Sequence, residues 1–514
     1  MNKVLKKLTL AIALTMTMAA GFSGCSSKQS SSESSDPSKL SAVKLKMYLL
    51  GDKPKDYDAV YGKVNDIMKK KINATLDVQF ISWGDMNTKY PLLFSSGDDF
   101  DLIFTASGWC FYNQMAVRNG FSEITTDMLK KDAPNTYKNE PKVAWDQAKV
   151  NGKIYMVPND QGHEYSYNVF AIRGDLREKY GIPEIKSEAD LEKYYDAVAK
   201  NEKGIVSLVN GGVQNLYYPY AFEGNGLAVL KGANSNSDNP SLFYKLDDTS
   251  GKVVSIVDTD AYKDYVVKMK QFADNGYWSK SSLSSKETRD DAFKAGKAAS
   301  MVWNIGSAAS DAASINAQHP DWKVEIVDIH PGVKKVANPY TNNGMAINAS
   351  SQNVDRALMA LDLLRYDKDI YNLTTFGIEG THWQAVGDKQ YKELSTSSNF
   401  PANNVCPWGW HVDSMARTDE SQPAIVDQMS NKWAKEDTVN NILQAFNFDD
   451  SNVKNEMAAV NNVTIQYGIP LSLGVISDPV KGLETYKQKL KEAGLDKIQK
   501  EAQKQVDAFI KGTK

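Results

Sequence analysis

The chain has 514 residues and a formal net charge of −3 at pH 7, and hydrophobic residues make up 42% of it. This length is enough for two or three domains, each with a sizeable core. The mildly acidic balance lacks the basic face that a nucleic-acid partner requires, so we predict no nucleic-acid partner.

The first residues have the features of an export signal. Three lysines precede an uncharged, mostly apolar run at 8–20, which is too short to span a bilayer. The run ends in "GFSGC", which resembles the lipobox of bacterial lipoproteins, although Phe22 stands where Leu is usual. The resemblance implies a signal peptide at 1–24 and a lipid on the sulfur of Cys25. An ordinary signal peptide with a chance cysteine is the alternative.

A Ser-rich segment at 25–42 follows the signal and contains "SSKQSSSESSDPSKLS". Such a segment cannot bury enough apolar surface to offset its ordering entropy, so we predict a flexible tether. Removal of the leader takes away three lysines and no acids, which makes the mature charge −6. A lipid, a tether and a folded body together predict a protein anchored at the extracellular face of the membrane.

The next stretch predicts strands and helices in strict alternation. Hydrophobic periodicity indicates strands at 43–49, 76–80 and 100–106, with helices between them around 60–67 and 87–95. This β-α-β-α-β order with short connections is typical of a parallel sheet flanked by helices. Ligands of such sheets bind beyond the carboxyl ends of the strands, where "SWGD" and "TASGWCFY" lie.

Alternation continues through the rest of the chain. Ser187 and Asp190 form a capping-box-like start to a helix at 186–200. The last sixty residues are mostly helical in pattern, and no internal repeat is visible. The other expected elements are a short strand within 150–161, a strand at 167–176, a helix at 258–278, a helix, strand and helix within 292–312, strands at 322–329 and 344–349, and a helix at 353–367.

Four segments carry a resemblance to a known family. They are "DLIFTASGW", "GKIYMVPND", "AFKAGKAASMVWNIG" and "FGIEGTHW", and they fall in the order found in extracellular solute-binding proteins of sugar ABC transporters. The chain resembles the large Gram-positive lipoproteins of the maltose-binding-protein-like family 1. In those proteins a family-specific region ends the chain, which would be about 447–509 here. The resemblance covers essentially the whole mature chain.

The resemblance implies an α/β, two-lobed, periplasmic-binding-protein-like fold of the class II type, with a hinge between the lobes and a helical C-terminal extension. Lobe one would be 43–157 plus 306–346, and lobe two 158–305 plus 347–514. The chain would cross between them at "YMVPND", "WNIG" and "NGMAIN". It also implies a monomer that closes around its ligand and docks on ABC permease subunits.

A sugar site needs flat aromatic rings for the C–H faces and polar groups for the hydroxyls. Turns that combine both are the predicted ligand-binding positions. They contain Trp83 and Asp85; Ser107, Trp109 and Tyr112; Asn159, Asp160, Gln161 and Tyr165; Trp303 and Asn304; Glu379, His382 and Trp383; and Trp408 and Trp410.

Each position also has a structural interpretation, because an aromatic residue at a strand end can cap the core and Asn or Asp can form a turn. Among the aromatics after the third strand, we rank Trp109 first as a ligand contact and Tyr112 second, with Phe111 in the core. Of Trp408 and Trp410, we expect one to face the ligand.

Motifs of catalysis are missing from the sequence. It has no H-E-x-x-H, G-x-S-x-G, Walker loop, G-x-G-x-x-G or C-x-x-C. Acidic pairs such as Asp98 and Asp99 are adjacent, so their side chains diverge and do not form the opposed carboxylates of a glycosidase. We predict no catalytic residue, cofactor or metal. A disulfide between Cys110 and Cys406 would join the two predicted lobes, so we expect free thiols.

The resulting hypothesis is a lipid-anchored extracellular solute-binding protein. It would capture an oligosaccharide between its lobes and deliver it to an ABC importer without covalent chemistry. Three alternatives stay open: binding of another solute such as a peptide, a cell-surface polysaccharide-active enzyme, and a surface adhesion lipoprotein.

Overall fold

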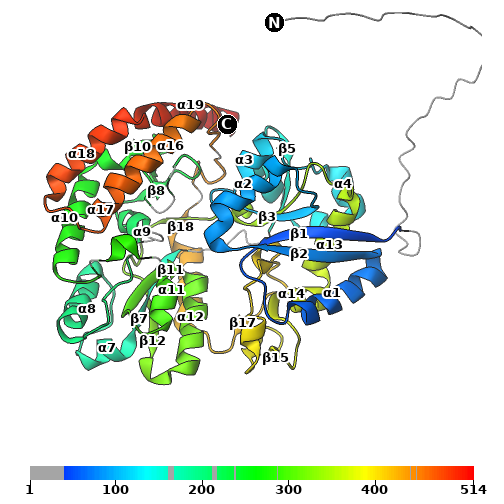
Figure 1. Cartoon of the computed structure of the whole chain (residues 1–514), viewed down its shortest axis with the longest axis horizontal. Helices are drawn as coiled ribbons and strands as arrows, with labels where there is room; N and C mark the ends of the chain where they lie inside the picture. Colours follow the sequence, from blue (N-terminus) through cyan, green and yellow to red (C-terminus); the bar gives the residue numbers. More distant parts are fainter. Residues whose placement is uncertain are drawn as a thin grey trace, which may run out of the picture.

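The computed structural model describes residues 40–159, 167–210, 217–234, 236, 239–279, 281–285, 287–439, 441–446 and 448–513. Figure 1 shows two lobes side by side, one blue, cyan and yellow and the other mostly green and red. Each lobe has its own sheet and its own buried apolar core. None of the helices within these ranges is both long enough and apolar enough to cross a membrane.

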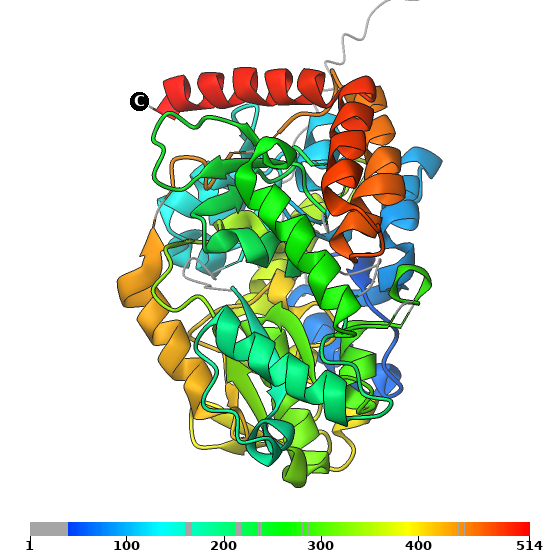
Figure 2. The same cartoon turned by 90° about the vertical axis from the view of Figure 1, so that its left-hand side faces the viewer.

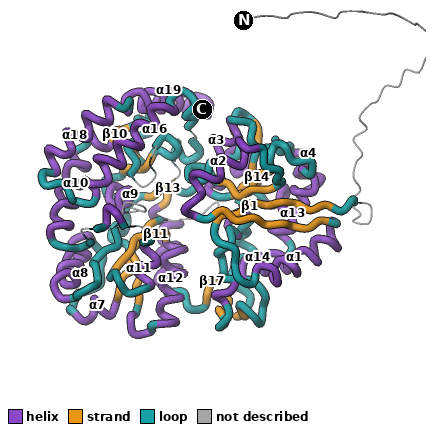
Figure 3. Tube along the Cα trace, in the orientation of Figure 1, coloured by secondary structure: helices purple, strands orange, loops and turns teal. Residues whose placement is uncertain are grey.

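Lobe one is built on a five-stranded sheet in the order β2-β1-β3-β14-β6. The central strand β1 (Val43–Leu50) pairs in parallel with β2 (Ala74–Ile81) and β3 (Leu102–Thr105), which confirms the predicted parallel sheet. Strand β14 (Gly344–Ile347) is antiparallel to β3 and to β6 (Met156–Pro158). Figure 3 shows these strands in orange between purple helices.

Helices cover the sheet of lobe one. Helix α1 (Tyr57–Ile72) buries Val60 and Val64, and its last turn holds three lysines, which the helix dipole favours. Helices α13 (Val354–Tyr366) and α14 (Lys368–Phe376) pack against α1. The remaining elements of this lobe are α2 (Met86–Ser96), α3 (Tyr112–Val117), α4 (Thr126–Asp132), α5 (Pro134–Asn139), α6 (Lys142–Gln147), β4 (Lys149–Val150), β5 (Lys153–Ile154), β15 (Trp383–Val386), β16 (Gln390–Glu393) and β17 (Thr418–Asp419).

Lobe two has an antiparallel sheet in the order β11-β7-β12. The strands are β11 (Ser300–Asn304), β7 (Asn168–Arg173) and β12 (Val324–Val327), and α12 (Ile305–Gln318) packs on all three. The other elements before the C-terminal helices are α7 (Gly174–Lys179), α8 (Glu188–Asn201), α9 (Tyr217–Glu223), β8 (Leu227–Val229), β9 (Leu242–Lys245), β10 (Val254–Ser255), α10 (Asp260–Asp274), α11 (Arg289–Lys294) and β13 (Lys335–Val336).

The C-terminal helices form a layer over lobe two. They bury Tyr486 and Val506 in the same core as Phe243 from β9. Figure 2 shows the layer in orange and red, beside the green α10. The layer and the segment before it consist of α15 (Ala424–Lys432), β18 (Thr438–Val439), α16 (Lys454–Val463), α17 (Ile469–Ser472), α18 (Pro479–Glu492) and α19 (Leu495–Thr513).

The structure exchanges two segments between the predicted lobes. The stretch 306–346, expected in lobe one, holds α12 and β12, and these pack in the core of lobe two. Conversely, α13 and α14 from the stretch 347–514 pack in lobe one. The periodicity of a helix reveals that it buries one face, but it does not reveal against which sheet.

The chain therefore crosses between lobes from β6 to β7, from β13 to β14, and from β17 to α15. The first predicted crossing, "YMVPND", includes β6, which pairs with β14 in the sheet of lobe one. "NGMAIN" is the second crossing rather than the third, and "WNIG" lies inside lobe two, where β11 pairs with β7.

Both described cysteines are free and buried, as expected. We expected free thiols because a disulfide would join the two lobes. That reason is wrong, because Cys110 and Cys406 both belong to the core of lobe one. The Sγ of Cys406 accepts a hydrogen bond of 3.2 Å from the amide of Leu50. Burial raises the pKa of both thiols, so they are inert apolar groups rather than reactive ones.

Candidate functional site

Three tryptophans gather beyond the carboxyl ends of the parallel strands of lobe one. Trp83 follows β2, Trp109 follows β3, and Trp408 comes from the 407–409 turn. The Trp83 ring stacks on Trp109 with centroids 6.2 Å apart and on Trp408 with centroids 6.4 Å apart. Trp83 is 48% exposed and the other two are half-buried. We call Trp83, Trp109 and Trp408 the tryptophan platform.

Local hydrogen bonds hold Trp109 in the platform. After β3 ends, the Oγ1 of Thr105 donates to the carbonyl of Cys110 at 2.9 Å, and Gly108 adopts a φ of +85° that tightens the turn. The indole Nε1 of Trp109 then donates to the carbonyl of Asn342 at 2.9 Å. Ser107 is buried and shares a 2.7 Å hydrogen bond with Thr341, so it fixes the turn rather than presenting a free hydroxyl.

A hydrogen bond and an aromatic contact hold Trp408 in position. The amide Nδ2 of Asn159 donates to the carbonyl of Trp408 at 2.9 Å. The ring of Phe104 lies edge-on to Trp408 at 6.2 Å and contacts Trp109 at 5.4 Å. A Cβ on Gly409 would come within 3.0 Å of the Phe104 ring and 2.9 Å of the Met345 sulfur. The turn therefore requires glycine for this close approach.

The turn that carries Trp109 lies against lobe two. A Cβ on Gly108 would meet the Cδ of Lys231 at 3.3 Å, so the stem of this lobe-two lysine lies against the platform turn. The Nζ of Lys231 donates to the Oδ1 of Asn338 at 3.2 Å. Gly232 in turn lies beside Phe448, which precedes the C-terminal helices. Three segments that are distant in sequence thus meet at this site.

Lobe two contributes a cavity of about 160 Å³ that includes Lys231 in its wall. We call it the lobe-two cavity. Its lining is mostly apolar with a few polar groups, as in many ligand pockets. It comprises Tyr167, Glu223, Leu227, Ala228, Val229, Leu230, Lys231, Tyr244, Leu246, Lys334, Lys335, Val336, Ala337, Asn338, Leu443 and Gln444.

Lys335 is buried in this cavity, and Glu223 beside it is half-buried. The Nζ of Lys335 lies 3.9 Å from the Oε2 of Glu223 and 3.9 Å from the Oδ2 of Asp328. It also lies over the rings of Tyr167 and Trp433, at 5.4 and 5.6 Å from their centroids. Burial raises the pKa of Glu223 to about 7, and the neighbouring Lys335 offsets part of that rise.

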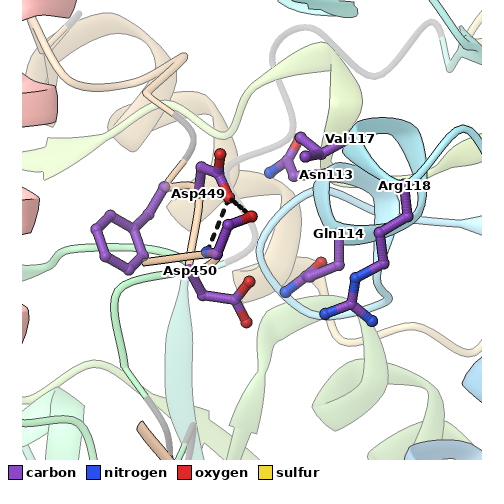
Figure 4. Close-up of a pocket in the computed structure, with 8 residues that line it drawn as sticks. Asn113, Gln114, Val117, Arg118, Asp449 and Asp450 are labelled. Carbon is purple, nitrogen blue, oxygen red and sulfur yellow. Dashed lines mark hydrogen bonds between the residues drawn. The ribbon is translucent and has the colours of Figure 1, made fainter. Parts of the chain in front are cut away.

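A second, smaller crevice lies where α3 of lobe one meets the C-terminal region. Figure 4 shows Arg118 and Gln114 on the side of α3, opposite Asp449 and Asp450. Its volume of about 10 Å³ is less than one water molecule requires, so this crevice is a contact between lobes and not a ligand site.

Four predicted site residues are buried in the core of lobe one, which contradicts their predicted role. The Oη of Tyr112 donates to the carbonyl of Ala148, so this residue packs inward, as Phe111 does against Tyr90. The other three also satisfy their polar atoms internally: His382 lies 3.1 Å from Asp56, Trp383 donates to Gly377, and Trp410 donates to Thr374.

Other predicted residues have local structural partners. Asp85 pairs with Lys89 at 2.8 Å, and this contact lowers the pKa of the carboxyl. Glu379 is exposed and accepts from the amide of Ala385. In lobe two, Asn304 caps α12 by accepting from the amide of Ser307 at 2.9 Å, and the guanidinium of Arg289 covers Trp303, 4.0 Å from its ring centroid. Asp160, Gln161, Tyr165 and Cys25 lie outside the described residues.

Sequence reasoning missed the charged residues of lobe two. Lys231, Glu223 and Lys335 had no motif to mark them, because a lone lysine or glutamate is ordinarily a solvated surface residue. The aromatic rings near Glu223 in the sequence, Tyr218, Tyr220 and Phe222, are core residues. Among the described residues, no cluster of three or more His, Cys, Asp or Glu side chains has the arrangement of a metal site.

Comparison with solved structures identifies the fold. A crystal structure of the N-glycan transport solute-binding protein NgtS from Streptococcus pneumoniae matches with a TM-score of 0.74 and 25% identity, over 92% of this chain and all of that one. An HMO-binding solute-binding protein from Bifidobacterium longum infantis matches with a TM-score of 0.64 over 91% of this chain and 99% of that one. At 16% identity, that second match shows the fold alone. The predicted two-lobed α/β class is confirmed.

Comparison of sequences identifies the family. A Streptococcus pneumoniae protein named carbohydrate ABC transporter substrate-binding protein is 26% identical over 99% of both chains. Residues 442–511 match a domain of unknown function, DUF3502, which agrees with the family-specific region expected at about 447–509. Residues 51–366 match the family described as bacterial extracellular solute-binding protein. This match spans more than half of the chain, and the protein therefore belongs to the bacterial extracellular solute-binding protein family.

Proposed function

We propose that this protein captures an oligosaccharide between its two lobes and delivers it to an ABC importer. The observation that carries the proposal is the tryptophan platform. Flat indole faces at the carboxyl ends of a parallel sheet suit the apolar C–H faces of sugar rings, and they add contact area at a low entropy cost. The names of the relatives, an N-glycan transport protein among them, support a carbohydrate ligand.

Capture would proceed by hinge closure. The open form would present the platform of lobe one, a sugar would stack on it, and lobe two would then close over the sugar. Lys231 and Asn338 lie opposite the platform and would supply hydrogen bonds to ring hydroxyls. The three lobe crossings are the segments that would bend, because the two cores are otherwise separate.

A peptide-binding protein and a polysaccharide-cleaving enzyme would each need different residues at this site. A peptide ligand would favour charged clamps for its termini over stacked indoles. A polysaccharide-cleaving enzyme would need two carboxylates about 5–10 Å apart beside the sugar. Asp85, the carboxylate in the Trp83 turn, is instead paired with Lys89. The relatives are named as substrate-binding proteins, which favours binding over catalysis.

We further propose that Cys25 carries a lipid that anchors the protein at the extracellular face of the membrane, where it would meet its permease as a monomer. The lipobox-like "GFSGC" and the Ser-rich tether support this proposal. The change Cys25→Ala should abolish metabolic labelling by a fatty acid and release the protein into the medium. A variant that stays in the membrane fraction would refute the anchor.

Calorimetry with oligosaccharide and dipeptide panels tests the main proposal. A sugar at 100 times its Kd should add about 2.7 kcal/mol to the free energy of unfolding, which a thermal shift detects. Binding of dipeptides without binding of any glycan would overturn the proposal. Hydrolysis products released from a bound glycan would favour the enzyme instead.

A further inference from the structure

The lobe-two cavity carries an excess of positive charge. Three lysines, Lys231, Lys334 and Lys335, line it against one carboxylate, that of Glu223. The whole chain has a net charge of −3, so this cavity is a local reversal of sign. An anionic group would be attracted into such a wall, because apolar surroundings weaken the screening by water.

Lys335 is the buried member of this set. Its side chain is 1% exposed, and its Nζ has no hydrogen-bond acceptor among the described residues. The two carboxylates at 3.9 Å are too distant for a hydrogen bond. An ammonium group has three donors, and leaving them unfilled in a buried site is costly. A ligand oxygen in the cavity would fill them.

Asp328 acts as a fixed counterion rather than as a ligand group. Its Oδ1 accepts from the Oη of Tyr220 at 3.2 Å and from the amide of His330 at 2.8 Å. Its Oδ2 accepts from the Nε1 of Trp433 at 3.3 Å. These bonds hold the Asp328 carboxylate in place, with its Oδ2 3.9 Å from the Nζ of Lys335.

Glu223 completes the cavity wall. Its Oε2 is buried and has no hydrogen-bond partner within the described part of the chain. With a pKa raised to about 7, it is readily protonated, and a protonated carboxyl can donate to an incoming carboxylate. The cavity can thus present donors from both Lys335 and Glu223 to one anionic group.

The size and place of the cavity match one unit of a longer ligand. A volume of about 160 Å³ is about five waters' share of the liquid and is smaller than the 300–1,000 Å³ typical of whole-ligand pockets. Lys231 lines the cavity and also lies against the platform turn at Gly108. The two surfaces are therefore adjacent.

From this combination we infer that the lobe-two cavity is a subsite for a carboxylate-bearing sugar unit, so the ligand is an acidic oligosaccharide. The inference rests on the proposed function. The tryptophan platform would stack the neighbouring rings, while Lys335 and Lys231 would bind the carboxylate. Uronic acids and sialic acids share this chemistry.

Matched ligand pairs test the charge directly. The mature chain is titrated calorimetrically with an oligogalacturonide and with the same chain fully methyl-esterified, and with a sialylated glycan and its desialylated parent. We expect one acidic member to bind at least tenfold more tightly than its neutral partner, and the pair that responds identifies the source of the carboxylate. Equal affinities within both pairs would overturn the inference and leave the proposed function intact. If no glycan binds, acidic or neutral, both the inference and the proposed function are overturned.

The affinity for an acidic ligand should rise as the pH falls, which distinguishes it from a neutral ligand. The groups facing Glu223 are Lys335 and Asp328, with Lys231 and Lys334 also in the cavity wall. Burial lowers the pKa of His330, whose ring lies tilted against Tyr220, so this imidazole stays neutral above pH 6.5. With a Glu223 pKa of about 7, its protonation alone should raise affinity for the anion up to about eightfold from pH 8 to pH 6.5. Desolvation lowers the pKa of Lys231 to about 8, so its gain of charge over this range acts in the same direction. An affinity that falls over this range would contradict a carboxylate ligand.

Three substitutions separate a binding role from a structural one. Glu223→Gln removes the repelling charge and should strengthen acidic-sugar binding at pH 8, a gain that mere damage to the fold would not produce. Lys335→Met should weaken acidic binding at least fivefold and leave neutral binding unchanged. Lys231→Gln should weaken acidic binding at least fivefold and neutral binding by a smaller factor, because Lys231 also faces the ring hydroxyls. If Lys335→Met fails to fold, Lys231→Gln on the exposed wall carries the test. Lys53→Gln in lobe one is the control, and an equal loss there would refute the site.

Discussion

The substitution Trp83→Ala should weaken sugar affinity while leaving the fold intact. Trp83 is 48% exposed, and a whole tryptophan presents about 250 Å², so about 120 Å² of it faces solvent. A sugar that covers about half of this area would gain about 1.5 kcal/mol at about 25 cal/mol per Å². We therefore expect about a tenfold rise in Kd by calorimetry.

Trp410→Ala is the matched control for this experiment. Trp410 is fully buried and lies two residues from Trp408, so its truncation should lower the free energy of unfolding by about 3–5 kcal/mol. The fraction that stays folded should bind sugar with nearly unchanged Kd, because the platform is intact. The reasoning is refuted if Trp83→Ala leaves Kd unchanged while its melting temperature matches the parent, or if Trp410→Ala abolishes affinity without destabilising the protein.

Further expected outcomes concern packing, pH and closure. Gly409→Ala should lower the melting temperature and weaken sugar binding, because the added methyl meets Phe104 and Met345; an unchanged melt would contradict the tight turn. The folded-state pKa of Glu223 is raised from 4.5 to about 7, so its stabilising effect is complete below pH 4.5 and is lost by about pH 7. In melts across this range, Glu223→Gln should gain stability relative to the parent as the pH rises, and a constant difference would refute the shift. Arg118→Glu places like charges opposite Asp449 and Asp450, so small-angle scattering should detect a more open liganded state; scattering identical to the parent's would show that the crevice has no role in closure.

Local patterns predicted the elements of this protein well. The alternation at 43–49 and the apolar face of the following helix were enough to predict β1 and α1. Side chains return to the same face every two residues in a strand and every 3.6 in a helix, so a few residues reveal the element. The same local reasoning located Trp83 and Trp109 at turns after strands and Trp408 in a glycine-containing turn. It also selected Trp383 and Trp410, which are core residues, because an aromatic beside a glycine turn has the same local sequence whether it faces inward or outward.

The amino-acid sequence by itself determined the α/β class, the order of strands and helices and the parallel sheet of the first lobe, since these follow from short-range periodicity. The C-terminal region followed only from the resemblance to a known family. Only the tertiary structure decided which lobe each later helix joins, that Cys110 and Cys406 share one core, and that Lys231, Glu223 and Lys335 meet in one cavity beside the platform. Those outcomes depend on contacts between segments more than 100 residues apart. The sequence around a single lysine does not indicate which distant carboxylate or ring its side chain will approach.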